Sequence, residues 1–198
     1  MNNEEKSRLA NMVLAPYIQK ATALQGQFRY VGGNQFRHAL GTLAILMDYH
    51  YIDPVLLKAS IIHDVFEDTQ CVTPDEIINL DGDGRAVYQL VMEVTRQKID
   101  DKDEPKDAYL ERILNDGSRN AKILKCADRI SNLTDLHTDI FDRNFVRKYI
   151  KETKKWVLPM AKEVNSDMHF ELKDIIERRE ENLRIYNMFW PLKKKKKH

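Results

Sequence analysis

The sequence predicts an all-α fold in a single domain. Apolar residues recur at three- and four-residue spacing rather than in the alternation of a half-buried strand, and only 7 glycines and 6 prolines interrupt the 198 residues. A hydrophobic content of 42% supports one core, and the length demands no second domain. We therefore expect one helical domain over residues 1–192 and a disordered lysine-rich tail over residues 193–198.

Charge and composition exclude several classes of protein. The 32 lysines and arginines balance 31 acids, so no field of one sign favours nucleic acid as a partner. For the terminal lysines, a tether to nucleic acid or anionic lipid stays open beside a merely solvated tail. Cys71 and Cys126 lack the spacing of a disulfide scaffold or zinc ribbon, and no segment approaches the roughly eighteen apolar residues of a membrane span. We expect a cytoplasmic protein.

Four helices are predicted in the first half of the chain. Helical spacing of apolar residues places them at about residues 9–18, 38–47 and 54–68, and from Pro74 onward. Proline suits the first position of a helix, where its missing N–H is not needed, so Pro54 and Pro74 mark helix starts. Gly32 and Gly33 belong to a polar loop that precedes the second helix. The third helix is so apolar that we place it at the centre of the core.

Four further helices are predicted in the second half. They cover about residues 85–95, 121–137, 144–162 and 168–188. The charged segment 99–105 is expected to be a loop, either merely solvated or mobile over an active site.

Four polar residues interrupt the most apolar helix. His63 stacks under Glu67 at helical spacing, and Asp64 stacks under Asp68. Burial of three carboxylates and an imidazole is costly unless a metal ion or paired cations compensate. A divalent cation is the simplest explanation.

Two other predicted helices supply further metal ligands. His38 begins one apolar helix, and Asp128 lies beside Arg129 in another. Each is ambiguous alone, because a single buried histidine is often only hydrogen-bonded and an aspartate next to an arginine is often an ion pair. Together with His63 and Asp64 they form a mixed imidazole and carboxylate set, which suits manganese, iron or zinc and leaves positions for water and substrate.

These motifs resemble a known family. The order His38, His63-Asp64, Asp128 resembles the signature of the HD superfamily of metal-dependent phosphohydrolases. Residues 63–69 (HDVFEDT) and 125–133 (KCADRISNL) resemble the HDxxEDT and KLADRLxN motifs of the hydrolase domain of RelA/SpoT-type enzymes. Further similar elements are Gly26-Gln27-Phe28-Arg29, Val94-Thr95, Glu152-Thr153 and Pro159-Met160-Ala161. The chain departs from the family at Tyr30, usually basic, and at residues 34–37, near where the family holds guanine and phosphate.

The resemblance implies a single HD-domain helical fold and an enzyme of the stringent response. It implies that a divalent metal, most often Mn2+, is held by His38, His63, Asp64 and Asp128. The implied reaction removes the 3′-pyrophosphate of the alarmone (p)ppGpp, giving GDP or GTP and pyrophosphate. We expect Glu67 and Asp68 to handle the protons of this reaction, although they could instead only orient His63 and the metal. The expected nucleotide contacts are Arg29 and Asn132, with Lys98, Arg129 and Tyr149 as weaker candidates.

Two alternatives to this function stay open. One is an HD phosphohydrolase for another small nucleotide, such as a nucleoside monophosphate, an adenine alarmone or NADPH. The other is a catalytically idle nucleotide-binding regulatory domain. We expect no alarmone-synthetase domain in a chain of this length. A homo-oligomer and a toxin-neutralising role also stay open.

Overall fold

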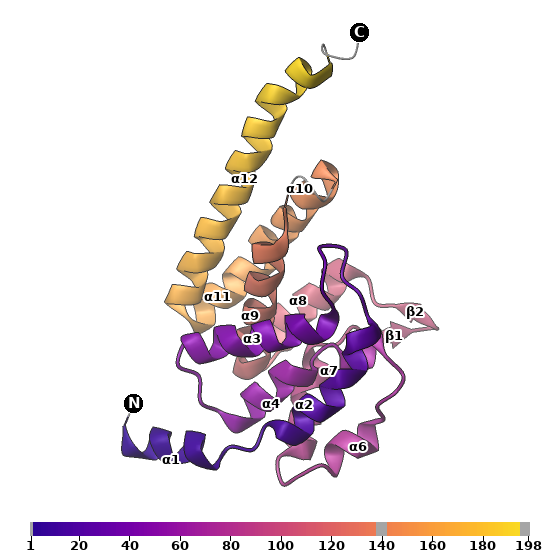
Figure 1. Cartoon of the computed structure of the whole chain (residues 1–198), viewed down its shortest axis with the longest axis vertical. Coiled ribbons are helices and arrows are strands. Elements are labelled where there is room, and N and C mark those ends of the chain that lie inside the picture. Colours follow the sequence, from indigo (N-terminus) through magenta and orange to yellow (C-terminus); the bar gives the residue numbers. More distant parts are fainter. Residues whose placement is uncertain (1, 138–141, 195–198) are drawn as a thin grey trace.

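Helices make up most of the described chain (Figure 1). The computed structural model describes residues 2–137 and 142–194, apart from the side chains of residues 99 and 186–194. Its α-helices are α1 (Asn3–Asn11), α2 (Ala15–Ala21), α3 (Gln35–Asp48), α4 (Pro54–Ile62), α5 (Val65–Asp68), α6 (Pro74–Ile78), α7 (Gly84–Val94), α8 (Lys106–Asp116), α9 (Arg119–Asp135), α10 (Arg143–Glu152), α11 (Leu158–Val164) and α12 (Ser166–Lys194). The predicted all-α fold is confirmed.

The core forms around α3, α4 and α9. Helix α3 packs against α9 and α4, while α4 also packs against α7. Every residue of α4 from Leu56 to Ile62 is buried, which confirms its predicted central position. The Asp53 side chain accepts a hydrogen bond from the Leu56 N–H (2.7 Å), and Pro54 follows it, so the helix begins where the sequence predicts.

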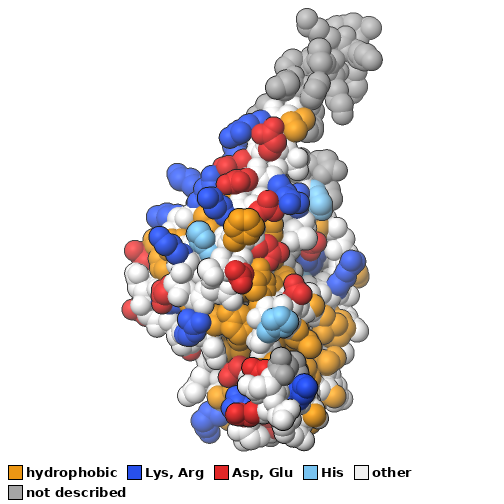
Figure 2. Space-filling model, turned by 90° about the vertical axis from the view of Figure 1, so that its left-hand side faces the viewer, with side chains coloured by type: hydrophobic (Ala, Val, Ile, Leu, Met, Phe, Trp, Pro, Cys, Tyr) orange, Lys and Arg blue, Asp and Glu red, His pale blue; other side chains and the backbone are white. Residues whose placement is uncertain are grey.

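The longest helix, α12, reaches beyond the rest of the domain (Figure 1). It packs against α9, α10 and α11, and its C-terminal part projects away from them. Basic and acidic side chains are interspersed on the face shown in Figure 2. Among the described residues, no helix combines the length and apolar character needed to cross a membrane. Helix α12 includes the first two residues of the predicted tail, and residues 195–198 lie outside the described residues.

Two predicted helices are wrong because each is interrupted near a proline. The helix expected at residues 9–18 is divided into α1 and α2, and Pro16 lies in the first turn of α2. The helix expected at residues 144–162 is divided by a π-helical turn, Thr153–Val157. Pro159 follows this turn, and its ring would clash with the carbonyl of Lys155 in a regular helix.

The segment predicted as a charged loop is mostly a hairpin. Strands β1 (Lys98–Ile99) and β2 (Lys102–Asp103) pair in antiparallel fashion. Asp100 (φ 50°) and Asp101 (φ 60°) adopt the left-handed backbone that a two-residue type I′ turn requires, and aspartate tolerates this conformation better than most residues. Helix α8, which we did not predict, follows the hairpin.

Candidate active site

The His63-Asp64 pair lies at a break between two helices. Helix α4 ends at Ile62 and α5 begins at Val65, so the continuous helix predicted over residues 54–68 is wrong. Adjacent side chains on a regular helix point about 100° apart. Because the helix is interrupted here, both side chains can turn towards one point, and His63 Nε2 lies 3.3 Å from Asp64 Oδ1.

The orientation of the His63 ring is set by the backbone. Its Nδ1 lies 2.8 Å from the Ser60 carbonyl oxygen and donates to it. Its Nε2 is buried and makes no hydrogen bond within the described part of the chain. Burial opposes a charged imidazolium, but the carboxylates of Asp64 and Asp128 outweigh it and raise the pKa of His63 to about 9. The Nε2 position thus attracts positive charge, and a metal ion fits there in place of a proton.

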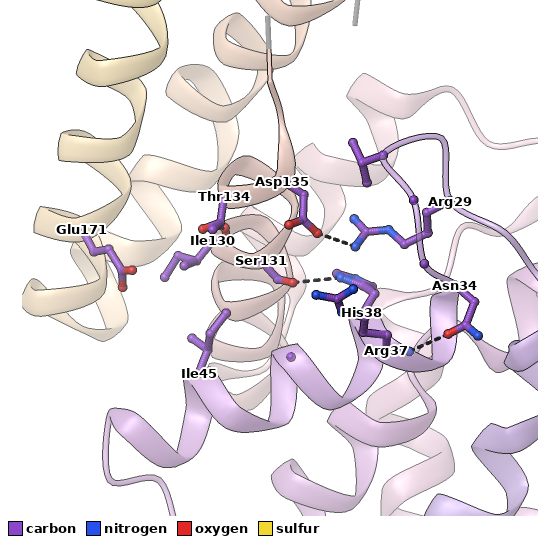
Figure 3. A pocket seen from close by; sticks show the side chains of 14 residues that line it. Arg29, Asn34, Arg37, His38, Ile45, Ile130, Ser131, Thr134, Asp135 and Glu171 are labelled. Atoms are coloured by element: carbon purple, nitrogen blue, oxygen red, sulfur yellow. Dashed lines mark hydrogen bonds and ion pairs between the residues drawn. The ribbon is translucent and has the colours of Figure 1, made fainter. Parts of the chain in front are cut away.

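His38 meets this cluster from α3. Its Nδ1 lies 2.9 Å from Ser131 Oγ on α9, and its Nε2 lies 3.1 Å from Asp128 Oδ1 and 3.6 Å from Asp64 Oδ2. Figure 3 shows the contact between His38 and Ser131. A Cβ atom at Gly41 would lie 3.5 Å from Ser131 Oγ, an ordinary van der Waals contact, so α3 and α9 lie close together beside the ring.

Three of the four predicted ligands form one compact cluster. Ligand atoms of His38, His63 and Asp64 all lie within 4.8 Å of one another. Asp128 Oδ1 adjoins both imidazoles, at 3.1 Å from His38 Nε2 and 3.9 Å from His63 Nε2. The buried Nε2 of His63, which has no hydrogen-bond partner among the described residues, and this mixed set of donors fit a divalent metal.

Asp128 is held by two neighbours on its own helix. Lys125 Nζ lies 2.6 Å from Asp128 Oδ2, and Asn132 Nδ2 lies 2.5 Å from Asp128 Oδ1. Burial would raise the pKa of Asp128, but Lys125 and the two imidazoles hold it well below its usual range. The carboxylate is therefore ionised and oriented.

Glu67 and Asp68 lie beside the cluster and are held separately. Glu67 Oε1 accepts from the Arg96 N–H (2.6 Å), and Asp68 Oδ2 accepts from Gln35 Nε2 (2.8 Å). Burial raises the pKa of both carboxyl groups, and the charge of Asp64 raises it further. Both groups line a cavity of about 690 Å³ that Lys98 also lines. A raised pKa and access to a cavity suit carboxyl groups for proton transfer.

Arg29 joins the cluster from the loop before α3. Its Nη1 lies 2.6 Å from Asp135 Oδ2 and its Nη2 lies 2.8 Å from Asn132 Oδ1. Asn132 in turn donates to Asp128, so a chain of hydrogen bonds links Arg29 to the ligands. Figure 3 shows Arg29 directed towards Asp135, at a second cavity of about 450 Å³ that Arg37 and His38 also line.

Two expected nucleotide contacts, Arg129 and Tyr149, pack against each other. Arg129 is only 2% exposed, donates to Thr153 Oγ1 (3.0 Å) and lies 4.2 Å above the Tyr149 ring. Neither Arg129 nor Tyr149 is among the described residues that line the two cavities. Their contacts are those of packing between α9 and α10.

Several residues of the site were not predicted. Ser131 and Lys125 lie three residues on either side of Asp128, so helical spacing could have placed them near it. Gln35 lies three residues before His38, so helical spacing could have placed it near His38 as well. Asp135 lies three residues after the predicted contact Asn132, at the same spacing, whereas the Arg96 N–H carried no such signal because its partner Glu67 lies 29 residues away.

The fold and this cluster match the single HD-domain helical fold expected from the sequence motifs. A solved structure described as "A metazoan ortholog of SpoT hydrolyzes ppGpp and plays a role in starvation responses" has a similar fold, with a TM-score of 0.71. It is 23% identical, and the match covers 83% of this chain and 93% of that chain. No family model matches the sequence.

Curated relatives identify the family within this class. The guanosine-3′,5′-bis(diphosphate) 3′-pyrophosphohydrolase MESH1 of Mus musculus is 30% identical over 152 residues, which are 75% of this chain and 82% of that protein. MESH1 of Drosophila melanogaster is 32% identical over 130 residues, 64% of this chain and 70% of that protein. The human MESH1 is 35% identical over 107 residues, 54% of this chain and 58% of that protein. The chain belongs to the MESH1 family.

Proposed function

We propose that this protein hydrolyses the 3′-pyrophosphate of (p)ppGpp, giving GDP or GTP and pyrophosphate. The observation that carries the proposal is the buried Nε2 of His63, which lies among carboxylates and has no hydrogen-bond partner in the described part of the chain, with Glu67 and Asp68 beside it. Relatives of the chain are named for this reaction. This set of residues suits metal-assisted phosphate hydrolysis.

The proposed metal is Mn2+, held by His38, His63, Asp64 and Asp128. When bound, it supplies a Lewis acid that polarises a phosphoryl oxygen and lowers the pKa of water. Ser131 and the Ser60 carbonyl orient the two imidazoles, and Lys125 orients Asp128.

Glu67 and Asp68 move the protons in this proposal. One carboxylate accepts a proton from the attacking water, whose oxygen bonds to the phosphorus nearest the ribose. The bond between that phosphorus and the 3′-oxygen breaks, and the other carboxyl group gives a proton to the departing oxygen. Their raised pKa values suit both steps.

The nucleotide is proposed to lie between the two cavities. The edges of the Arg29 guanidinium are taken by Asp135 and Asn132, so its planar faces are left to stack on a base. Lys98 lines the cavity that holds Glu67 and Asp68 and offers positive charge to phosphate groups. We place the reaction in the cytoplasm, where the free thiols of Cys71 and Cys126 would stay reduced.

The test is pyrophosphate release from ppGpp by purified protein with Mn2+, beside GTP, nucleoside monophosphates, an adenine alarmone and NADPH. Rapid release from ppGpp that stops on addition of a chelator is expected. Turnover of another nucleotide alone would keep the metal site but overturn the substrate. Tight nucleotide binding without turnover of any substrate would indicate a regulatory domain.

A further inference from the structure

Gln35 lies in the segment where the chain departs from the family motif, and its backbone is fixed. It is the first residue of α3, one turn before His38, so both side chains lie on the same face of the helix. Its N–H donates to the Gln27 carbonyl (2.9 Å). Asn34 caps the helix through the Arg37 N–H (3.0 Å). The backbone of Gln35, from which its side chain extends, is therefore held in place.

The two polar atoms of the Gln35 side chain differ in their surroundings. Nε2 donates to Asp68 Oδ2 at 2.8 Å. Oε1 is buried and has no hydrogen-bond partner among the described residues. The opposite orientation of the amide would set its oxygen against the carboxylate, so the contact with Asp68 fixes which atom stays unpaired. A buried acceptor left unpaired costs free energy, which indicates that a donor from outside the chain occupies this place.

The two carboxylate oxygens of Asp68 differ in their hydrogen bonding. Its Oδ1 receives no hydrogen bond from the described part of the chain, whereas Oδ2 is held by Gln35. Asp64, His63 and His38 are the charged or titratable groups of the cluster that act on it, and Lys98 and Arg96 line the same cavity. Burial and Asp64 raise the pKa of Asp68, while the amide of Gln35 opposes this.

We propose that Gln35 is a positioning residue that holds Asp68 by its amide nitrogen and accepts a hydrogen bond from the attacking water by its amide oxygen. This inference rests on the proposed function. The water donates one hydrogen to Gln35 Oε1 and the other to Asp68 Oδ1, which leaves a lone pair for phosphorus. Asp68 then takes the second hydrogen as a proton while the oxygen bonds to phosphorus and the 3′-oxygen departs with a proton from Glu67.

The test compares Gln35→Met, which keeps the length and removes both polar atoms, with wild-type protein. We expect kcat for ppGpp to fall by about 10- to 100-fold, with a much smaller change in KM. In a plot of kcat against pH, the fall on the acid side should move to higher pH. The reason is that Asp68 loses the hydrogen bond from Gln35 Nε2, which favours its ionised form. Bound manganese and the melting temperature should not change. Gln19→Met, on the exposed surface of α2, is the matched control.

A second readout does not depend on turnover. The pKa of the Asp68 carboxyl, measured by carbon NMR in the full chain, should be higher in Gln35→Met than in wild type. Gln35→Glu keeps the length without an amide donor and serves if the methionine variant does not fold. If the wild type is active and these variants keep its kcat, the acid limb of its pH profile and its Asp68 pKa, the role of Gln35 is overturned. A wild type that releases no pyrophosphate overturns the proposed function itself.

Discussion

The imidazole of His63 donates through Nδ1 to the Ser60 carbonyl, and this one hydrogen bond decides which ring nitrogen faces the carboxylates. Ser131 does the same for His38 from another helix. A ring that is already oriented loses little freedom when it binds a metal, so such partners strengthen binding. The Ser60 carbonyl and Ser131 thus orient two ligands of the proposed metal without binding the metal themselves.

Asp64→Ala should remove metal and activity together. Asp64 adjoins both imidazoles of the cluster, so its loss takes away one ligand and the negative charge that attracts a cation. We expect the manganese content, measured by mass spectrometry of the metal, to fall close to that of chelator-treated protein, and pyrophosphate release to fall by about 10²-fold or more. Asp48→Ala, at an exposed position, is the control. Full activity in Asp64→Ala would contradict the assignment.

Glu67→Gln should separate proton transfer from metal binding. The amide oxygen that replaces the carboxylate can still accept from the Arg96 N–H, so the local structure should persist. The variant should keep its manganese and lower kcat by about 10²-fold, because an amide can neither give nor take up a proton at neutral pH. Steady-state kinetics beside metal analysis is the measurement. Unchanged turnover would leave Glu67 only the role of holding Arg96.

At the scale of secondary structure, the hairpin after α7 is held at its base. Glu104, 5% exposed, accepts from Arg112 Nη2 (2.9 Å) and from the Gln97 N–H (3.2 Å). Arg112 also donates to the Thr95 carbonyl (3.0 Å), next to Arg96, whose N–H holds Glu67. The hydrogen bonds at the base of the hairpin therefore connect it, through the backbone at Thr95 and Arg96, to the carboxyl group of Glu67.

Arg112→Met should destabilise the fold in a pH-dependent way. Hydrogen bonding to Arg112 lowers the pKa of Glu104, so this pair contributes stability above the unfolded-state pKa and loses it as the pH falls through the lower folded-state pKa. We expect the free energy of unfolding at pH 7 to drop by about 1.5–3 kcal/mol. The difference from wild type should shrink at acidic pH, below the lowered folded-state pKa, where Glu104 is protonated in both the folded and the unfolded state. Urea denaturation at the two pH values measures both effects, and a difference that does not depend on pH would exclude Glu104 as its source.

At the scale of the whole molecule, the cluster joins three parts of the core. His38 comes from α3, His63 and Asp64 from the break between α4 and α5, and Asp128 from α9. An ion bound by all of them exists only in the folded chain, so binding must stabilise the fold.

Manganese should therefore raise the melting temperature. At a concentration 100 times the dissociation constant, binding contributes about 2.7 kcal/mol. For a chain of this size, that corresponds to a rise of about 5–10 °C. Thermal denaturation monitored by circular dichroism, with manganese and then with excess chelator, measures the shift. Asp64→Ala should show none, and a wild type without a shift would contradict a cluster that holds a metal.

The helical core and the candidate ligands could be predicted from the sequence because both depend on local patterns. Helical spacing of apolar residues placed α3, α4, α7 and α9, and motif resemblance selected His38, His63, Asp64 and Asp128. The boundaries failed at the break between α4 and α5, and where a proline or two left-handed aspartates changed the backbone, as before α2, in the π-helical turn and in the hairpin. Such interruptions depend on single residues rather than on a period.

The sequence by itself determined that the chain is helical, which family it resembles, and which residue types meet at the site. Only the tertiary structure decided that Gln35 holds Asp68, 33 residues away, and that Arg29 is bound by Asp135, 106 residues away. It also placed Arg129 against Tyr149 rather than in a cavity. The physical reason is that helical periodicity reports only which face of one helix a residue occupies. The partner across the site depends on how separate helices pack.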